Sequence, residues 1–129
     1  MRRSWLKLIG TAERPCPDFW KESYASSRKR PRSIHVGDHM VLYAVGGTKR
    51  VFAIAEVTSE PYASGNSEWP YRVDITYLVH LPRSQGVHID QVSTAKRNLI
   101  RSVRRASYIQ LSSEEYERAS AKLRAASRP

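Results

Sequence analysis

The segment SIHVGDHMVLYAVGGTKRVFAIAEVTSEPYASGNSEWPYRV, residues 33–73, decides the fold class of this chain. Two apolar runs, 39–45 and 50–57, flank a GGTK turn whose paired glycines permit the positive φ angles of a tight hairpin. The second run is apolar on both faces, which is typical of a strand buried in the middle of a sheet or barrel. A polar loop carrying Trp69 then leads into residues 71–79, the clearest alternating strand.

Further strands are expected on both sides of this segment. Residues 4–9, SWLKLI, alternate and place Trp5 and Lys7 on the same face. Residues 86–90 predict a short strand, and residues 105–111 predict a last one. The total is five or six strands.

Two or three short helices complete the predicted fold. Asp18 is a candidate N-cap for a helix over residues 18–24, and residues 93–100 predict another short helix. Ser112 and Glu115 form the S-x-x-E capping box of a C-terminal helix. The residues expected on its buried face are three and four apart: Tyr116, Ala119 and Leu123. These elements predict an α+β fold, a small twisted and mostly antiparallel β-barrel with the helices packed outside.

The length of 129 residues predicts a single domain over residues 1–129, with residues 125–129 as a frayed tail. One cysteine, Cys16, excludes a disulfide within the chain and fits a reducing cytoplasm. The apolar part of MRRSWLKLIG is too short for a signal peptide, and no run approaches the roughly 20 apolar residues of a membrane span. We therefore expect a cytoplasmic protein without membrane contact.

Positive charge is the strongest compositional signal, because 22 Lys and Arg face 12 Asp and Glu for a net charge of +10. Such an excess attracts polyanions, although a solvated basic surface that keeps the protein soluble is the alternative. The basic residues cluster along the chain, which favours nucleic acid as the partner. The candidate phosphate ligands in these clusters are Arg28, Lys29, Arg30, Arg32, Arg104 and Arg105.

Three blocks of the chain resemble the EVE domain family: VGDHMVLYAVGGTKRVFAIAEVTSEPY (36–62), WPYRV (69–73) and RRASYIQLSSEEYE (104–117). That family belongs to the PUA-like group, which also holds the YTH and ASCH domains. The resemblance covers nearly the whole chain. It implies a small twisted β-barrel with a pocket that accepts one flipped-out base. YTH domains read N6-methyladenine in RNA, and EVE domains are associated with modified bases, including modified cytosines in DNA.

The same resemblance implies an aromatic base-binding site. One YTH cage tryptophan follows the first strand, and another follows the strand equivalent to AEVTSE, so the counterparts here are Trp20 and Trp69. Two indoles can hold a flat base between their faces, and stacking is worth roughly 1–3 kcal/mol per base. We expect Ser23 to contact the base edge, and Trp5 and Tyr24 to complete the site. The alternative for Trp20 is an ordinary core aromatic on a helix face, and the alternative for Trp69 is a loop residue folded onto the barrel. Trp5 is expected in the core or on the pocket floor.

Ser107 and Tyr108 lie at the start of the last predicted strand, in a segment that resembles a recurrent RRxSYI-like stretch of the family. Such a segment either lines the pocket or packs the strand against the core. The sequence leaves both alternatives open.

The leading hypothesis is a non-catalytic module that binds DNA or RNA through a modified base and needs no cofactor. The alternative is a general PUA-like RNA-binding protein without base selectivity. The sequence leaves the oligomeric state open.

An ASCH-like ribonuclease is the minority hypothesis. Lys21, Glu22, His35 and His39 could supply the acid, base and phosphate-stabilising groups of a nuclease, but no spacing requires it. The pattern H-x-x-D-H around Asp38 lies at a turn and lacks the helical H-E-x-x-H arrangement, so no metal is expected.

Overall fold

The computed structural model describes residues 2–102 and 108–128, without side-chain detail for 101 and 102. The strands, in chain order, are β1 (Ser4–Ile9), β2 (Tyr24–Ser27), β3 (His39–Ala44), β4 (Arg50–Val57), β5 (Tyr62–Ala63), β6 (Tyr71–His80), β7 (Val87–His88) and β8 (Tyr108–Leu111). The helices are α1 (Leu99–Ser102) and α2 (Ser113–Ala126), with single 3-10 turns at Arg83–Gln85 and Ile89–Gln91. The two-residue strands β5 and β7 raise the number of strands above the five or six predicted.

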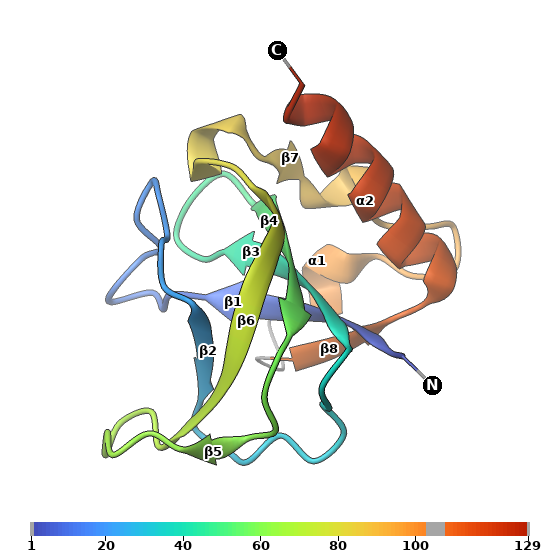
Figure 1. Cartoon of the computed structure of the whole chain (residues 1–129). Coiled ribbons are helices and arrows are strands. Elements are labelled where there is room, and N and C mark those ends of the chain that lie inside the picture. The colour runs from blue at the N-terminus through green and yellow to red at the C-terminus, as the bar shows by residue number, and fades with distance from the viewer. Residues whose placement is uncertain (1, 103–107, 129) are drawn as a thin grey trace.

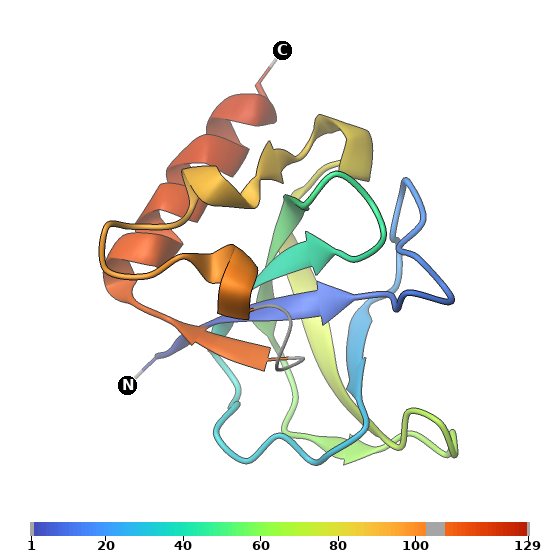
Figure 2. The same cartoon turned by 180° about the vertical axis from the view of Figure 1, so that it is seen from behind.

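The strands form one curled sheet in the order β2-β6-β4-β3-β1-β8, with β5 added beside β6 and β7 beside β4. Strands β1 and β3 run parallel, and the other described pairs are antiparallel. Helix α2 lies along one side of the sheet, near β7 and α1, whereas β2 and β5 lie on the opposite side (Figures 1 and 2). The predicted α+β fold, a curled and mostly antiparallel sheet with helices outside it, is confirmed.

Strand β4 lies at the centre of the hydrophobic core, as its two apolar faces predict. Its residues 51–55 are fully buried and contribute to two apolar clusters. One cluster contains Leu123 of α2, and the other contains Trp5 of β1. The second cluster also includes the half-buried Trp20, so the aromatic segment after β1 rests on the core.

The C-terminal helix begins at the predicted capping box. Ser112 Oγ accepts a hydrogen bond from Glu115 N at 3.1 Å, and a Glu115 carboxylate oxygen accepts one from Ser112 N at 2.8 Å. The three residues of its predicted face, Tyr116, Ala119 and Leu123, are buried. The helix continues to Ala126, so the first residues of the predicted frayed tail are helical. Among the described helices, none is long and apolar enough to cross a membrane.

The predicted helix over residues 18–24 is wrong. This segment is irregular until β2 begins at Tyr24. Asp18 does not cap a helix, because its carboxylate accepts a hydrogen bond from Ser84 N at 3.1 Å and its carbonyl accepts one from Arg83 N at 2.5 Å. Bonds to a distant part of the chain therefore replace the local helical ones.

The predicted helix over residues 93–100 is shorter and lies later in the chain, at Leu99–Ser102. Ser93 Oγ accepts a hydrogen bond from Leu99 N at 3.0 Å, and Thr94 forms an isolated bridge with Arg97. The first part of the predicted strand, residues 105–107, lies outside the described residues.

Candidate functional site

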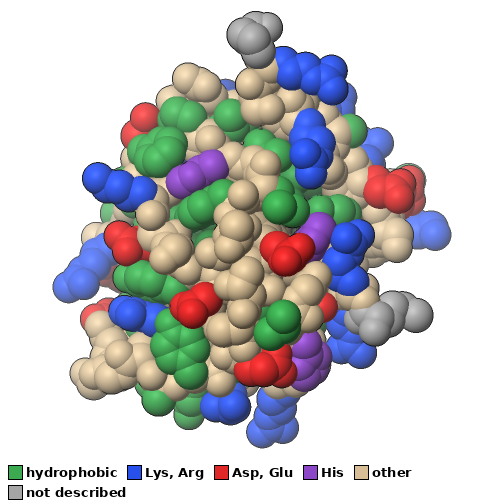
Figure 3. Space-filling model, in the orientation of Figure 1, with side chains coloured by type: hydrophobic (Ala, Val, Ile, Leu, Met, Phe, Trp, Pro, Cys, Tyr) green, Lys and Arg blue, Asp and Glu red, His purple; other side chains and the backbone are tan. Residues whose placement is uncertain are grey.

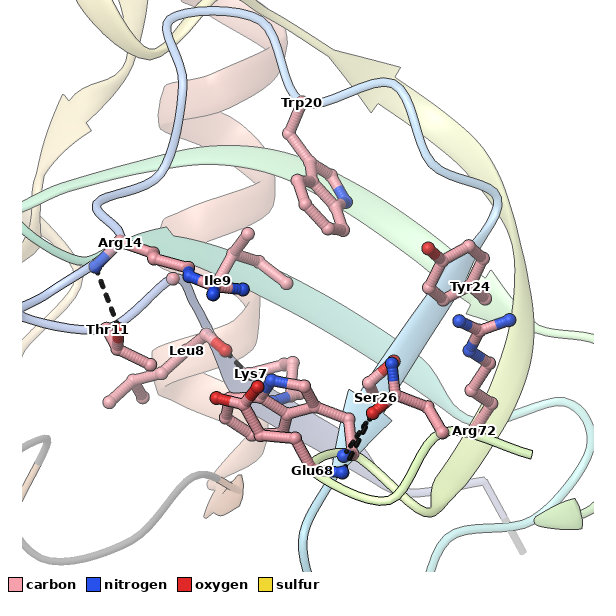
Figure 4. Close-up of a pocket in the computed structure, with 13 residues that line it drawn as sticks. Lys7, Leu8, Ile9, Thr11, Arg14, Trp20, Tyr24, Ser26, Glu68 and Arg72 are labelled. Atoms are coloured by element: carbon pink, nitrogen blue, oxygen red, sulfur yellow. Dashed lines mark hydrogen bonds between the residues drawn. The ribbon is translucent and has the colours of Figure 1, made fainter. Parts of the chain in front are cut away.

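A cavity of about 240 Å³ opens between the loop after β1, strands β2 and β6, and the loop that joins β5 to β6. Its lining combines apolar and aromatic surface with several polar and charged side chains, and Figure 4 shows the side chains that surround it. Pockets for drug-sized ligands measure roughly 300–1,000 Å³, so this volume suits a single small ring system.

Three of the five predicted base-binding residues line this cavity together: Trp20, Tyr24 and Trp69. The Trp20 side chain points into the hollow in Figure 4, and its ring meets Tyr24 edge-on with centroids 6.4 Å apart. Two indoles from distant parts of the sequence thus reach one small cavity.

The other two predicted base-binding residues, Trp5 and Ser23, are not among the residues that line the cavity. Trp5 is only 8 % exposed, and its indole N–H donates to Asp38 Oδ2 at 3.0 Å. Ser23 is exposed, and its carbonyl accepts a hydrogen bond from Ile75 N at 2.9 Å. Ser26, two residues into β2, supplies a hydroxyl to the lining instead.

Strand β6 holds the segment that carries Trp20. His80 Nε2 lies 2.5 Å from the Trp20 carbonyl oxygen, so this nitrogen carries the proton and donates it. Tyr77 Oη donates to the carbonyl of Glu22 at 2.6 Å, and the Tyr77 and His80 rings stack with centroids 3.7 Å apart. The backbone carbonyls of Trp20 and Glu22 are therefore fixed to one strand, which restricts the position of the indole.

Trp69 is held by hydrogen bonds within its own loop. Asn66 Oδ1 accepts from Glu68 N at 2.8 Å and from Trp69 N at 3.0 Å. Ser64 Oγ donates to the Trp69 carbonyl at 2.5 Å. Asn66 thus forms an Asx turn that presents the indole to the cavity.

Replacing Asn66 with alanine is expected to loosen this loop without unfolding the protein. The change removes two hydrogen bonds, each worth about 1 kcal/mol, from an exposed turn. Amide exchange at Glu68 and Trp69 should become about tenfold faster, whereas the melting temperature should change little. Ser67→Ala in the same loop is the matched control. Equal exchange rates in both variants would show that Asn66 does not hold the turn.

Unsatisfied polar atoms gather around the cavity. Among the described residues, the buried side-chain nitrogen and oxygen atoms without a hydrogen-bond partner are Trp20 Nε1, Arg72 Nε and Tyr108 Oη. Trp20 and Arg72 line the cavity. Tyr108 lies next to a third lining residue, because its ring centre is 4.7 Å from Lys7 Nζ. Because nine-tenths or more of buried polar groups are normally paired, the two unpaired donors of the lining residues Trp20 and Arg72 are available to a polar ligand.

The basic cluster of residues 28–32 adjoins the cavity. Arg28, Lys29, Arg30 and Arg32 are all exposed. The Arg28 guanidinium lies 4.8 Å from the Trp69 ring centre, on a face of the indole, and Arg30 donates to the carbonyl of Pro61 at 3.2 Å. On the face shown in Figure 3, Lys and Arg lie mostly around the outline, whereas Asp and Glu lie both in the middle and near the edges.

The sequence contains a second basic cluster, which consists of Arg97, Arg101, Arg104 and Arg105. Arg97 forms two hydrogen bonds to the buried carboxylate of Glu115, at 2.6 and 3.1 Å, so its charge is paired within the fold. Arg104, Arg105 and Ser107 lie outside the described residues. Tyr108 is half-buried, packs against Lys7 and is not among the lining residues.

Several lining residues were not predicted from the sequence: Lys7, Arg14, Ser26, Asn66, Glu68 and Arg72. The alternation of β1 offered one signal, because it puts Lys7 on the same face as Trp5 and Ile9. Arg72 belongs to the alternating strand β6. Its guanidinium lies 3.9 Å from the Tyr24 ring centre and forms part of the cavity wall.

The H-x-x-D-H segment has a structural role. Asp38 is buried and accepts hydrogen bonds from Arg3 N, Trp5 Nε1 and His35 N at 3.0–3.1 Å. His39 Nδ1 lies 2.6 Å from Tyr116 Oη, which ties β3 to α2. Lys21 and Glu22, two of the groups considered for a nuclease, are exposed and do not line the cavity, and neither do His35 and His39.

Replacing Asp38 with alanine is expected to lower the free energy of unfolding by about 3 kcal/mol, because three donors, including the buried indole N–H, lose a charged acceptor. Burial by itself raises the pKa of Asp38, but these hydrogen bonds outweigh burial and hold the pKa below its usual range. The stabilisation is therefore lost as pH falls through that lowered pKa. Urea unfolding at pH 7 measures the difference. The exposed Glu60→Ala in the same region is the control and should shift the midpoint far less.

A curled, mostly antiparallel sheet with a C-terminal helix beside it defines a PUA-like domain, and solved structures of the same shape support this class. The NMR structure of Rpa0253 from Rhodopseudomonas palustris matches with TM-score 0.64 and 17% identity, covering 95% of this chain and 94% of that chain. Atu2648 from Agrobacterium tumefaciens matches with TM-score 0.62 and 20% identity, over 93% and 92%. The ASCH protein of Zymomonas mobilis matches with TM-score 0.57 and 14% identity, over 94% and 96%.

The sequence itself matches the EVE domain model over residues 8–121, and the chain therefore belongs to the EVE domain family. The resemblance inferred from the three sequence blocks is confirmed. No curated protein shows significant sequence similarity to the chain. The identities to the solved structures are low, so those matches describe the fold alone.

Proposed function

We propose that this EVE domain is a non-catalytic module that binds nucleic acid by taking one modified base into the cavity between Trp20 and Trp69. The observation that carries the proposal is that these two indoles, from different segments, line the same small cavity. The backbone of each tryptophan is held by a hydrogen bond to a nearby side chain, so the site is largely formed before a ligand arrives. Preformed walls reduce the ordering cost of binding.

Recognition of a modification needs more than stacking. Stacking on an indole tolerates every base, and one added methyl group contributes about 0.8 kcal/mol, or about a fourfold preference. Stronger selection requires polar groups that a wrong base leaves unpaired. The unpartnered Trp20 Nε1 and Arg72 Nε beside the cavity support such selection.

The surrounding cations would hold the phosphates that flank the inserted base. Arg28, Lys29, Arg30 and Arg32 are exposed, and Arg28 lies against the Trp69 ring. We assign Arg104 and Arg105 the same role from their positions in the sequence. Contacts of this kind set affinity and register but not base identity. They predict a steep dependence of affinity on salt. The buried free thiol of Cys16 is compatible with a reducing compartment, and we propose that the module works in the cytoplasm.

The test is a binding panel at fixed salt. It compares single- and double-stranded DNA and RNA oligonucleotides that differ in one central base, either plain or modified. We expect one modification to bind at least tenfold more tightly than its plain counterpart. Equal affinity for every base would instead indicate a general RNA-binding protein, and cleavage of a labelled RNA by the pure protein would indicate a ribonuclease.

A further inference from the structure

Lys7 is an unusual residue of the cavity because it is an ionisable side chain that is buried. It belongs to β1, which lies between β3 and β8, and its side chain is 3 % exposed. Buried lysines are rare unless a carboxylate pairs with them, and no described carboxylate forms an ion pair with Lys7. Figure 4 shows Lys7 across the hollow from Trp20.

The amine of Lys7 has unused hydrogen-bonding capacity. An ammonium has three donors, and the described bond from Nζ goes to the adjacent Leu8 carbonyl at 2.9 Å. Its other described polar contact is the face of Tyr108, with the ring centre 4.7 Å away. A ligand in the cavity could therefore accept hydrogen bonds from Lys7 without breaking a structural one.

The remaining polar groups of the cavity are also mostly donors. Trp20 Nε1 and Arg72 Nε are buried without partners, and Asn66 uses its acceptor oxygen inside its own loop. Among the described residues, three cationic side chains line the cavity, Lys7, Arg14 and Arg72, against one carboxylate, Glu68. A donor-rich, positively charged cavity favours a ligand that offers acceptors and negative charge.

We infer that Lys7 is a specificity-determining residue, and that the base taken into the cavity carries a carboxylate, which accepts hydrogen bonds from the Lys7 ammonium. The inference rests on the proposed function, because it assumes that a base occupies the space between Trp20 and Trp69. A methyl-bearing base can fill the same space but leaves the donors of Lys7 and Trp20 unpaired, so it binds less tightly.

The pH dependence of binding has a defined direction. Burial lowers the pKa of Lys7 to about 7. On β8 its described neighbour is Tyr108, which stays neutral because burial raises its pKa. On β3 its neighbour is the apolar Leu42. The other charged residues of the cavity lining are Arg14, Arg72 and Glu68. A bound carboxylate stabilises the ammonium, so binding takes up a proton above pH 7. Affinity for a carboxylated base should fall by up to about tenfold per pH unit above pH 7 and stay nearly constant below it.

The experiment uses two DNA oligonucleotides that differ in one central base, 5-carboxylcytosine or 5-methylcytosine, at fixed salt and at pH 6.5 and 8.5. The wild-type protein should prefer the carboxyl probe by at least tenfold at pH 6.5. Lys7→Met, which replaces the amine with an apolar side chain of similar length, should reduce this preference to about twofold or less, chiefly by weakening binding of the carboxyl probe. Lys21→Met removes the same charge from an exposed site outside the cavity and should behave like the wild type.

The outcomes separate this inference from the proposed function. A carboxyl preference that Lys7→Met leaves unchanged would overturn the role of Lys7. A wild-type protein that binds both probes equally, but loses affinity for both on Trp20→Ala, would overturn the carboxylate and leave the base-binding cavity standing. Binding that is indifferent to both Trp20→Ala and Trp69→Ala would overturn the proposed function itself. Melting curves of each variant confirm that the comparison is made between folded proteins.

Discussion

Alanine at both Trp20 and Trp69 is expected to reduce affinity for the preferred modified oligonucleotide by about a hundredfold or more, and each single change by more than about tenfold. Base stacking on an aromatic side chain is worth roughly 1–3 kcal/mol, and the two indoles line the same cavity from separate segments. The losses should combine, because each variant exposes one side of the inserted base to water. Fluorescence anisotropy with a labelled oligonucleotide measures them.

The control for this prediction is Phe19→Ala. Phe19 is adjacent to Trp20 in sequence and 45 % exposed, but it packs against His80 and does not line the cavity. It should change affinity by less than about twofold. If both tryptophan variants bind as tightly as the wild type while folding normally, the base does not lie between the indoles. An equal loss of affinity for modified and plain probes would show that the indoles bind nucleic acid without selecting the modified base.

The sheet could be predicted well from local patterns. Alternation located β1 and β6, the two apolar faces of residues 50–57 located the buried β4, and the capping box located the start of α2. Each of these signals is local: it depends on side chains a few residues apart. The pairing of strands that are distant in sequence is consistent with these local signals.

Errors arose where distant partners decide the conformation. Asp18 is a suitable N-cap by type, but the amide that its carboxylate accepts from is that of Ser84, far along the chain. Arg97 belongs to a basic cluster in sequence, but Glu115 pairs with it in the fold. No local pattern distinguishes these uses of a charged side chain from the expected ones.

The site was only partly predictable for the same reason. Trp20 and Trp69 were identified through the family resemblance, because the periodicity of a sequence does not predict which loops meet in the fold. Lys7 was overlooked because a lysine within an apolar strand looks like an interruption of the pattern. The burial of Lys7 depends on β3 and β8, the strands that pair with β1 on its two sides.

The burial of Lys7 also predicts a large effect on stability. Its pKa in the folded protein is about 7, against an ordinary value of 10.5, so the folded state binds the proton less tightly than the unfolded chain does. Folding at neutral pH must then either desolvate the ammonium or release its proton. Both cost free energy, on the order of 4 kcal/mol from this difference in pKa. The contact with the Tyr108 ring offsets a small part of that cost.

The sign of the pH dependence follows from this lowered pKa. The penalty is greatest below pH 7, where the folded protein holds a charged lysine, and it is relieved as pH rises from about 7 toward 10.5. Lys7→Met should therefore raise the free energy of unfolding at pH 7 by several kcal/mol and flatten the increase in wild-type stability between pH 7 and pH 10. Urea unfolding of both proteins across this pH range measures it, with Lys21→Met as the exposed control. Should Lys7→Met prove no more stable than the wild type, the amine is not desolvated in the folded protein. If it gains stability while losing the carboxyl preference, the same side chain that weakens the fold recognises the ligand, as expected for a group placed for binding rather than for packing.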